Sequence, residues 1–197
     1  MAEYTSENVL RSFERLHTST GVEAAKQDQW LRRWATSPHM WPIALDLIKR
    51  SGNRTVQFYC IQAIQTRIFS PSWDALSTEA QTAVLKDLLA FVTMFSRRMQ
   101  EAPDSNIRRN LKLILKSSCE CVTRVALLSI PKKWPNVVGD LFSQFGQIRD
   151  GVDTRLALLL LLKSLATPLD TYTTLPIEQR QAAEAYLKRA LRDVFHI

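Results

Sequence analysis

Apolar residues recur at helical spacing along almost the whole chain, and turn-forming residues interrupt them about every 15 to 25 residues. In the first such segment, Val9, Leu10, Phe13 and Leu16 fall on one face of a helix. Glycine, which tight β-hairpins consume, occurs only five times in 197 residues. The pattern therefore predicts an all-α chain of consecutive antiparallel helices.

Turn and capping signals divide the chain into about nine expected helices. Ser37 before Pro38 is expected to cap the third helix, residues 70–72 to break the chain before Trp73, and Pro168 to stop the eighth helix. The expected helices cover about residues 5–17, 22–35, 38–50, 56–69, 77–95, 106–129, 136–148, 153–165 and 176–197. The first helices of successive pairs then start near 38, 77 and 135, which is close to the period of HEAT or armadillo units. We predict a HEAT-repeat α-solenoid of stacked antiparallel helix pairs.

The last expected helix has no partner helix in this chain. It starts at Pro176 and carries apolar residues at Leu187, Leu191, Val194 and Phe195. A terminal repeat normally presents a polar outer face. We therefore expect this chain to be the beginning of a longer array.

The positive charge of the chain is concentrated in one segment. The net charge is +7, and residues 97–133 contain nine Lys/Arg against three Asp/Glu, which leaves +6 there and +1 elsewhere. The helix expected over residues 106–129 places Arg109, Lys112 and Lys116 on one side. Such a stripe suits phosphates or an acidic partner, although a solvated helix face collects the same residues.

The sequence contains no motif of catalysis or of cofactor binding. There is no Gly-rich phosphate loop and no zinc-ligand pair, and the three histidines are far apart in sequence. Cys119 and Cys121 stand two residues apart on a helix, so their side chains point about 200° apart and cannot readily share a metal ion. With Cys60 they form an odd, small set, for which reduced, buried thiols are expected. We expect a binding protein without cofactor or metal, not an enzyme.

Targeting and membrane signals are also missing from the sequence. The first residues show no basic segment followed by an apolar run, so an intracellular protein is expected. The longest apolar run, residues 156–162, is too short for a bilayer that needs about 20 residues. We expect no membrane insertion.

Two further groups of residues could bind a partner. Gln62, Gln65 and Thr66 lie at positions i, i+3 and i+4 of the fourth helix, opposite its apolar residues, so this stripe is either a binding face or simply solvated. The five tryptophans could stack on bases, but their positions at helical spacing or helix junctions favour packing between repeats.

Several segments, taken together, resemble the N-terminal region of the importin-β superfamily of nuclear transport receptors. They are residues 30–31 (WL), 37–41 (SPHMW), 56–62 (VQFYCIQ), 73–77 (WDALS), 107–110 (IRRN) and 131–135 (PKKWP). Within the superfamily, residues 58–60, 107–110 and 151–153 look most like exportin-t, the tRNA exportin, with importins of the transportin-SR class next.

The resemblance implies functions for both stripes and both halves of the chain. It implies importin-β N-terminal-like HEAT repeats over residues 1–100 and exportin-type repeats over 101–197. In the family the helix that matches the fourth one binds the GTP-bound form of the small GTPase Ran, which assigns Gln62, Gln65 and Thr66 to Ran. Arg109, Lys112 and Lys116 would contact Ran or RNA phosphates.

The partners that the resemblance implies are Ran-GTP, tRNA or protein cargo, and nucleoporins, in a receptor that shuttles between nucleus and cytoplasm. Three alternatives stay open. They are an importin-type receptor for protein cargo, a HEAT-repeat scaffold without a transport role, and a basic RNA-binding repeat protein that acts without a GTPase.

Overall fold

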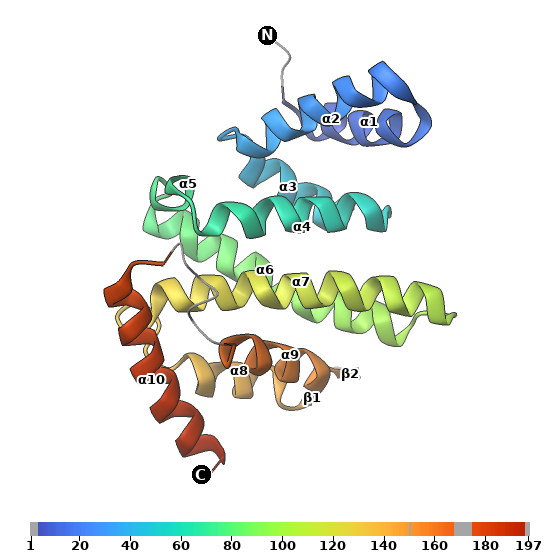
Figure 1. Cartoon of the computed structure of the whole chain (residues 1–197). Helices are drawn as coiled ribbons and strands as arrows, with labels where there is room; N and C mark the ends of the chain where they lie inside the picture. Colours follow the sequence, from blue (N-terminus) through green and yellow to red (C-terminus); the bar gives the residue numbers. More distant parts are fainter. Residues whose placement is uncertain (1–3, 150, 168–174, 196–197) are drawn as a thin grey trace. The chain divides into compact units, whose positions relative to one another are not determined.

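The computed structural model describes residues 4–149, 151–167 and 175–195, and it confirms an all-α fold of the HEAT type (Figure 1). These residues form ten helices and one short β-hairpin. Adjacent helices pack as antiparallel pairs: α1 with α2, α3 with α4, α6 with α7, and α8 with α9. The chain divides into two compact units, Met1–Ser77 and Thr78–Ile197. The predicted division of the repeats at residue 100 stays a prediction.

Unit 1 consists of two helix pairs and a short fifth helix. The helices are α1 (Ser6–Thr18), α2 (Gly21–Thr36), α3 (Met40–Arg50), α4 (Arg54–Ile68) and α5 (Pro71–Asp74). Their apolar faces meet in a core that includes Val9, Phe13, Trp34, Ile48 and Ile61. A single helix pair cannot bury its whole apolar face. The pairs are therefore stable only when they pack on one another.

Polar side chains fix the connections between these helices. The Asn53 side-chain oxygen accepts hydrogen bonds from the Thr55 and Val56 amides and so caps the start of α4. The Gln57 side chain is fully buried, and its Nε2 donates to the carbonyl oxygens of Ile48 and Ser51. This amide satisfies two carbonyls at the end of α3 and joins α3 to α4.

Two expectations for unit 1 were wrong. Ser37 does not cap the third helix, because its hydroxyl donates to the Trp34 carbonyl at the end of α2, and α3 begins only at Met40. Residues 70–72, which were expected to break the chain, instead begin α5, which starts at Pro71 because proline is favoured in a first helical turn. Trp73 of α5 is buried and packs against Trp41, with the two ring centroids 5.7 Å apart.

Unit 2 is built around one long central helix. It contains α6 (Thr78–Gln100), α7 (Ser105–Ser129), α8 (Val137–Phe145), α9 (Arg155–Leu165) and α10 (Ile177–Phe195). Asp104 caps α7 by accepting from the Ile107 amide at 2.8 Å. Because α6, α9 and α10 all pack on α7, its buried residues occupy more than one face, and both Cys119 and Cys121 lie in the core.

The connection between α8 and α9 differs from the expected turn. The seventh helix was expected to reach residue 148, but α8 ends at Phe145, and Ile148–Arg149 pairs antiparallel with Val152–Asp153 as strands β1 and β2. Gly151 supplies the positive φ of 74° that the hairpin needs. The Gln100 side chain holds β2 by donating to the Asp153 carbonyl and accepting from the Asp153 amide. This contact with α6 is remote in sequence, so local signals could not reveal it.

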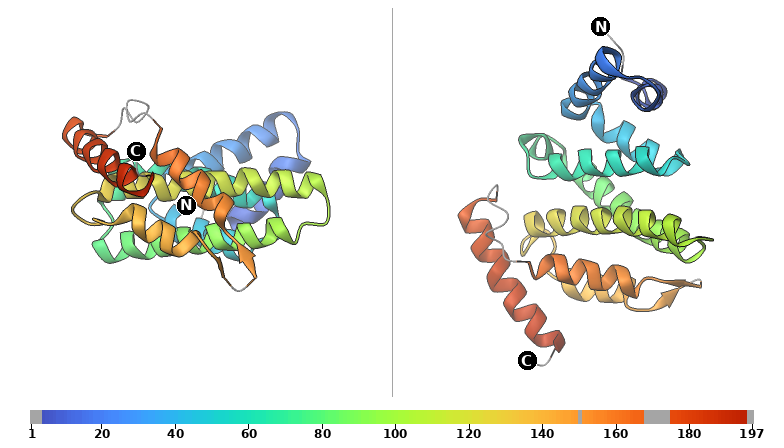
Figure 2. Two further views of the ribbon diagram at one scale, coloured as in Figure 1. Left: turned by 90° about the horizontal axis from the view of Figure 1, so that it is seen from below. Right: turned by 45° about the vertical axis from the view of Figure 1, so that its right-hand side comes forward.

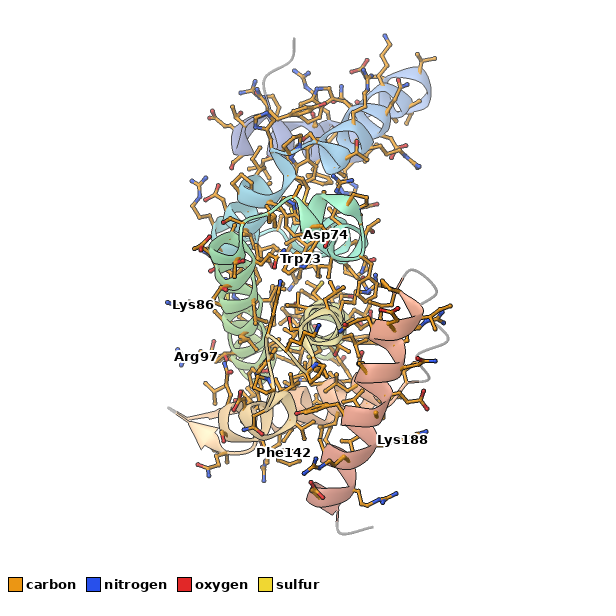
Figure 3. All side chains as sticks on the ribbon, turned by 90° about the vertical axis from the view of Figure 1, so that its left-hand side faces the viewer. Trp73, Asp74, Lys86, Arg97, Phe142 and Lys188 are labelled. Atoms are coloured by element: carbon orange, nitrogen blue, oxygen red, sulfur yellow. The ribbon has the colours of Figure 1, made fainter. Side chains whose placement is uncertain are left out.

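The last helix, α10, does not form an antiparallel pair with α9 but lies across the end of α7 (Figures 1 and 2). Gln179 Nε2 donates to the carbonyl oxygens of Leu127 and Ile130, both at 2.6 Å. The α10 residues Ala183 and Leu187 are buried, whereas Lys188 of the same helix points away from the other helices of unit 2 (Figure 3). The predicted stop at Pro168 and the side chains of Val194 and Phe195 lie outside the described residues.

Candidate functional site

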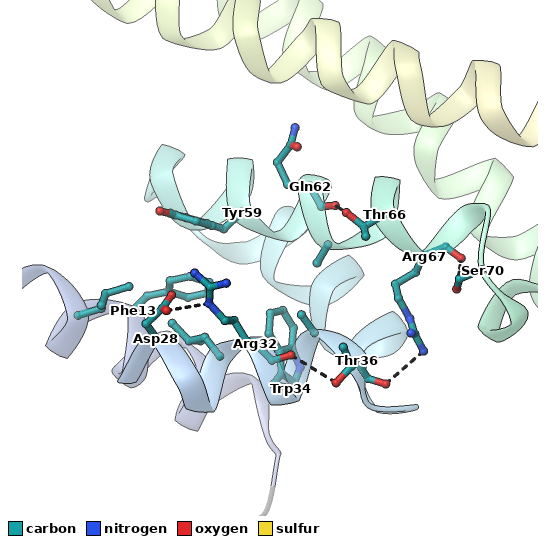
Figure 4. Close-up of a pocket in the computed structure, with 14 residues that line it drawn as sticks. Phe13, Asp28, Arg32, Trp34, Thr36, Tyr59, Gln62, Thr66, Arg67 and Ser70 are labelled. Carbon is teal, nitrogen blue, oxygen red and sulfur yellow. Dashed lines mark hydrogen bonds and ion pairs between the residues drawn. The ribbon is translucent and has the colours of Figure 1, made fainter. Parts of the chain in front are cut away.

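The predicted stripe on α4 lies beside a groove in unit 1 (Figure 4). Gln62 and Thr66 line this groove, which has a volume of about 370 Å³, but Gln65 is not among its lining residues. The Thr66 hydroxyl donates to the Gln62 carbonyl at 2.9 Å, so its hydrogen is already used within the helix. Gln62 and Gln65 are half-buried rather than fully exposed.

Helices α1, α2 and α4 build the wall of the groove. The apolar part comes from Phe13, Leu16, Leu31, Trp34 and Ala63. Most of these side chains also belong to the core of unit 1, so the groove is formed by rigidly packed residues. A groove with this lining can accept a large apolar side chain from a partner.

Tyr59 is the residue of this site that the sequence analysis missed. Its side chain is 46% exposed at the rim of the groove, and its ring lies 5.4 Å from that of Phe13. Tyr59, Gln62 and Thr66 follow one another at spacings of three and four, so they form one stripe along α4. That spacing is visible in the sequence, but Tyr59 was used there only as part of the segment 56–62, which carries the family resemblance.

Charged groups stand at both sides of the groove. On α2, Arg32 Nε donates to the Asp28 carboxylate at 2.7 Å. At the other side, Arg67 Nη2 donates to the Thr36 carbonyl at 3.2 Å (Figure 4). No ion pair to Arg67 is found within the described part of the chain. The groove thus combines an apolar floor with one unneutralised guanidinium.

The predicted basic stripe on α7 is exposed in unit 2. Arg109, Lys112 and Lys116 all face solvent, and Leu113 between them is 52% exposed. Lys116 forms an ion pair with Glu120 at 3.7 Å, whereas Arg109 and Lys112 have no partner among the described residues. The stripe therefore offers two uncommitted cations and one that is partly neutralised.

Four of the other six cations of residues 97–133 have surroundings of their own. Arg108 donates to the Ala102 carbonyl, and Lys133 donates to the Gln81 side chain. Arg97 points outward from α6 (Figure 3), and Arg98 lies over the ring of Phe95. The charge that is concentrated in sequence is thus distributed over several surfaces of unit 2.

The cysteines form part of the core. Cys60, Cys119 and Cys121 are free thiols with at most 1% exposure. Across residues 4–149, 151–167 and 175–195, no three His, Cys, Asp or Glu side chains gather as a metal site would require. None of the helices in these ranges is both long and apolar enough to span a bilayer.

Comparisons with known proteins support the importin-β superfamily. The chain is 25% identical to human (Homo sapiens) importin-13 over 173 residues, which are 86% of this chain and 17% of that protein. It is 23% identical to Bos taurus importin-13 over 178 residues (90% and 17%) and 26% identical to Gallus gallus importin-13 over 195 residues (98% and 18%). No family model matches the chain.

The chain spans less than a fifth of the length of these relatives. The relatives carry the name of an importin, so they support the superfamily without supporting exportin-t within it.

Proposed function

We propose that this chain belongs to a nuclear transport receptor of the karyopherin type and binds Ran-GTP through α4. The observation that carries the proposal is the similarity to importin-13, which extends over 86–98% of the chain in the three relatives described above. The stripe of Tyr59, Gln62 and Thr66 beside the groove supports it as a place where a partner side chain can bind. A receptor of this kind shuttles between nucleus and cytoplasm and contacts nucleoporins, and it performs no catalysis.

A pull-down with Ran loaded with GTP or GDP tests this proposal. We expect preferential binding of the GTP form, because a receptor that reads the switch segments of a GTPase distinguishes the two nucleotides. The double variant Gln62→Ala/Gln65→Ala should bind Ran-GTP more weakly, with a thermal midpoint within a few degrees of the wild type. Gln181→Ala, an exposed glutamine of α10, is the matched control and should bind as the wild type does.

Equal binding of both nucleotide forms, or no binding by the folded protein, would exclude the Ran proposal. A large fall in the thermal midpoint of the double variant would instead show that Gln62 and Gln65 contribute mainly to packing. In that case Tyr59→Ala, which changes a more exposed side chain of the same stripe, replaces the double variant as the test.

The cargo of the receptor is a second question, and the basic stripe on α7 favours tRNA as one candidate. Arg109 and Lys112 are exposed and uncommitted, as phosphate-binding cations must be. Lys112→Gln/Lys116→Gln should weaken tRNA binding and lower the slope of log K against log salt by roughly 0.7–0.9 for each lost phosphate contact. An unchanged slope would exclude tRNA as a cargo that binds this stripe. It would favour an importin-type receptor for protein cargo, as the name of the relatives suggests, or a scaffold without a transport role.

A further inference from the structure

A second pocket of unit 1, on the surface between α1 and α2, contains a cluster of cations. Its volume is about 400 Å³, and Arg11, Arg15, Lys26 and Arg33 line it. Arg11 and Arg15 are one helical turn apart on α1, and Lys26 and Arg33 are two turns apart on α2. All four side chains are exposed. Antiparallel packing of α1 on α2 thus brings four positive charges to one place.

This cluster is not evident from the charge of the segment. Residues 5–36 contain five Lys/Arg and four Asp/Glu, a net charge of only +1. The fold separates the positive side chains from the negative ones. Asp28 pairs with Arg32 outside the pocket, and no aspartate or glutamate is among the residues that line the pocket. Glu23 accepts a hydrogen bond from Gln27, which is one of the lining residues. Within the described ranges, none of the four cations forms an ion pair.

Like charges held close together without counterions repel each other, and this repulsion costs stability. Arginine predominates in the cluster, and its planar fork of donors matches the oxygens of a phosphate group. An anion bound between α1 and α2 would neutralise the cluster. The pocket therefore has the charge and the donor groups of a phosphate site.

Trp30 adds an aromatic surface to the same pocket. Trp34, Trp41 and Trp73 are at most 5% exposed, whereas Trp30 is half-buried and lines the pocket. The Tyr4 ring supports the indole, with the two centroids 5.1 Å apart. An indole that is held in place beside cations can stack on an unpaired base. The Asn8 and Gln27 amides in the same lining are groups that bind base edges or sugars.

We propose that the pocket between α1 and α2 binds single-stranded nucleic acid, with phosphates on the arginines and one base against Trp30. A double-stranded ligand does not fit, because its bases are stacked inside the duplex and cannot reach the indole. An acidic peptide would satisfy the cations but would leave the indole without a planar partner. The proposal is independent of Ran binding and of the stripe on α7.

Fluorescence anisotropy of labelled decauridylate, measured at several salt concentrations without Ran, tests the proposal. Arg11→Gln/Arg33→Gln should lower the salt slope by roughly 1.4, since each contact with a single strand contributes about 0.7. The matched control is Lys86→Gln/Lys163→Gln, which removes the same charge from exposed positions on α6 and α9 and should leave the slope unchanged. Trp30→Leu should weaken binding about tenfold, and Trp30→Phe, which keeps an aromatic ring, should restore most of it.

Three results would overturn the proposal. Equal loss of binding in the two double variants would show that only net charge matters, and a loss confined to the Lys86→Gln/Lys163→Gln variant would place the nucleic acid in unit 2. Competition by decaglutamate as strong as that by unlabelled decauridylate would identify a site for acidic peptides instead. Far-UV circular dichroism confirms folding of each variant, and if Trp30→Leu unfolds, Trp30→Phe and the arginine variant still decide the outcome.

Discussion

At the scale of single residues, the three cysteines show how burial controls chemistry. Burial raises the pKa of the Cys60 thiol to about 12, and burial is also the first cause that raises the pKa of Cys119 and of Cys121. The thiolate is the reactive form of cysteine. At physiological pH these side chains therefore behave as small apolar groups.

We predict that none of the three thiols reacts with a disulfide reagent in the native protein at pH 8, and that all three react once the protein is unfolded. Below its raised pKa each thiol stays protonated, and the surrounding core also blocks the reagent. Ellman's reagent, with and without guanidinium chloride, provides the measurement. Fast reaction of one thiol under native conditions would show that its part of the core opens locally.

At the scale of secondary-structure elements, α10 packs on α7 with buried apolar side chains and with one side-chain amide. Ala183 and Leu187 are buried, and the Gln179 amide bonds to two carbonyl oxygens near the end of α7. Those carbonyls belong to Leu127 and to Ile130, which follows the last helical residue. Gln179 thus satisfies acceptors that the end of a helix leaves open.

We predict that Gln179→Ala lowers the stability of unit 2 by about 1–2 kcal/mol, because two partly buried carbonyl groups lose their donor. Hydrogen exchange of the α10 amides should become faster before that of α7 changes. Gln181→Ala is the control, since Gln181 is exposed two residues further along the same helix. Equal effects of the two substitutions would show that the bonds of Gln179 are replaced by water without cost.

At the scale of the whole molecule, the chain consists of two units that each have a buried core. Four of the five tryptophans, all except Trp134, belong to residues 1–77. The three longest helices, α6, α7 and α10, belong to residues 78–197. Tryptophan fluorescence therefore reports mainly on unit 1, whereas far-UV circular dichroism is weighted towards unit 2.

We predict that guanidinium unfolding followed by these two signals gives different midpoints, because repeat proteins with separate cores do not always unfold in a single cooperative step. Trp134→Phe removes the one tryptophan of unit 2 and should leave the fluorescence midpoint unchanged. Coincident transitions in the wild type and in this variant would show that the two units unfold together.

The sequence alone determined the fold class and most of the helices. Helical periodicity and turn residues are local properties, so they located nine of the ten described helices, and they also placed Arg109 and Lys112 on an exposed side of α7. Local signals failed at Ser37, where either neighbouring helix could take the cap, and at β2, where the partner is remote in sequence. Ser37 caps the helix before it rather than the one after it, and β2 is held by Gln100 of α6.

Only the tertiary structure decided which residues meet to form the candidate sites. The groove beside Gln62 and the cation pocket beside Trp30 each lie between helices, and helix packing sets the rotation of one helix against another. The core contacts of Phe13 with Trp34, whose ring centroids are 6.4 Å apart, help to fix that rotation for α1 and α2. A sequence records the charge of each residue, but the distance between two charges on different helices exists only after the helices have packed.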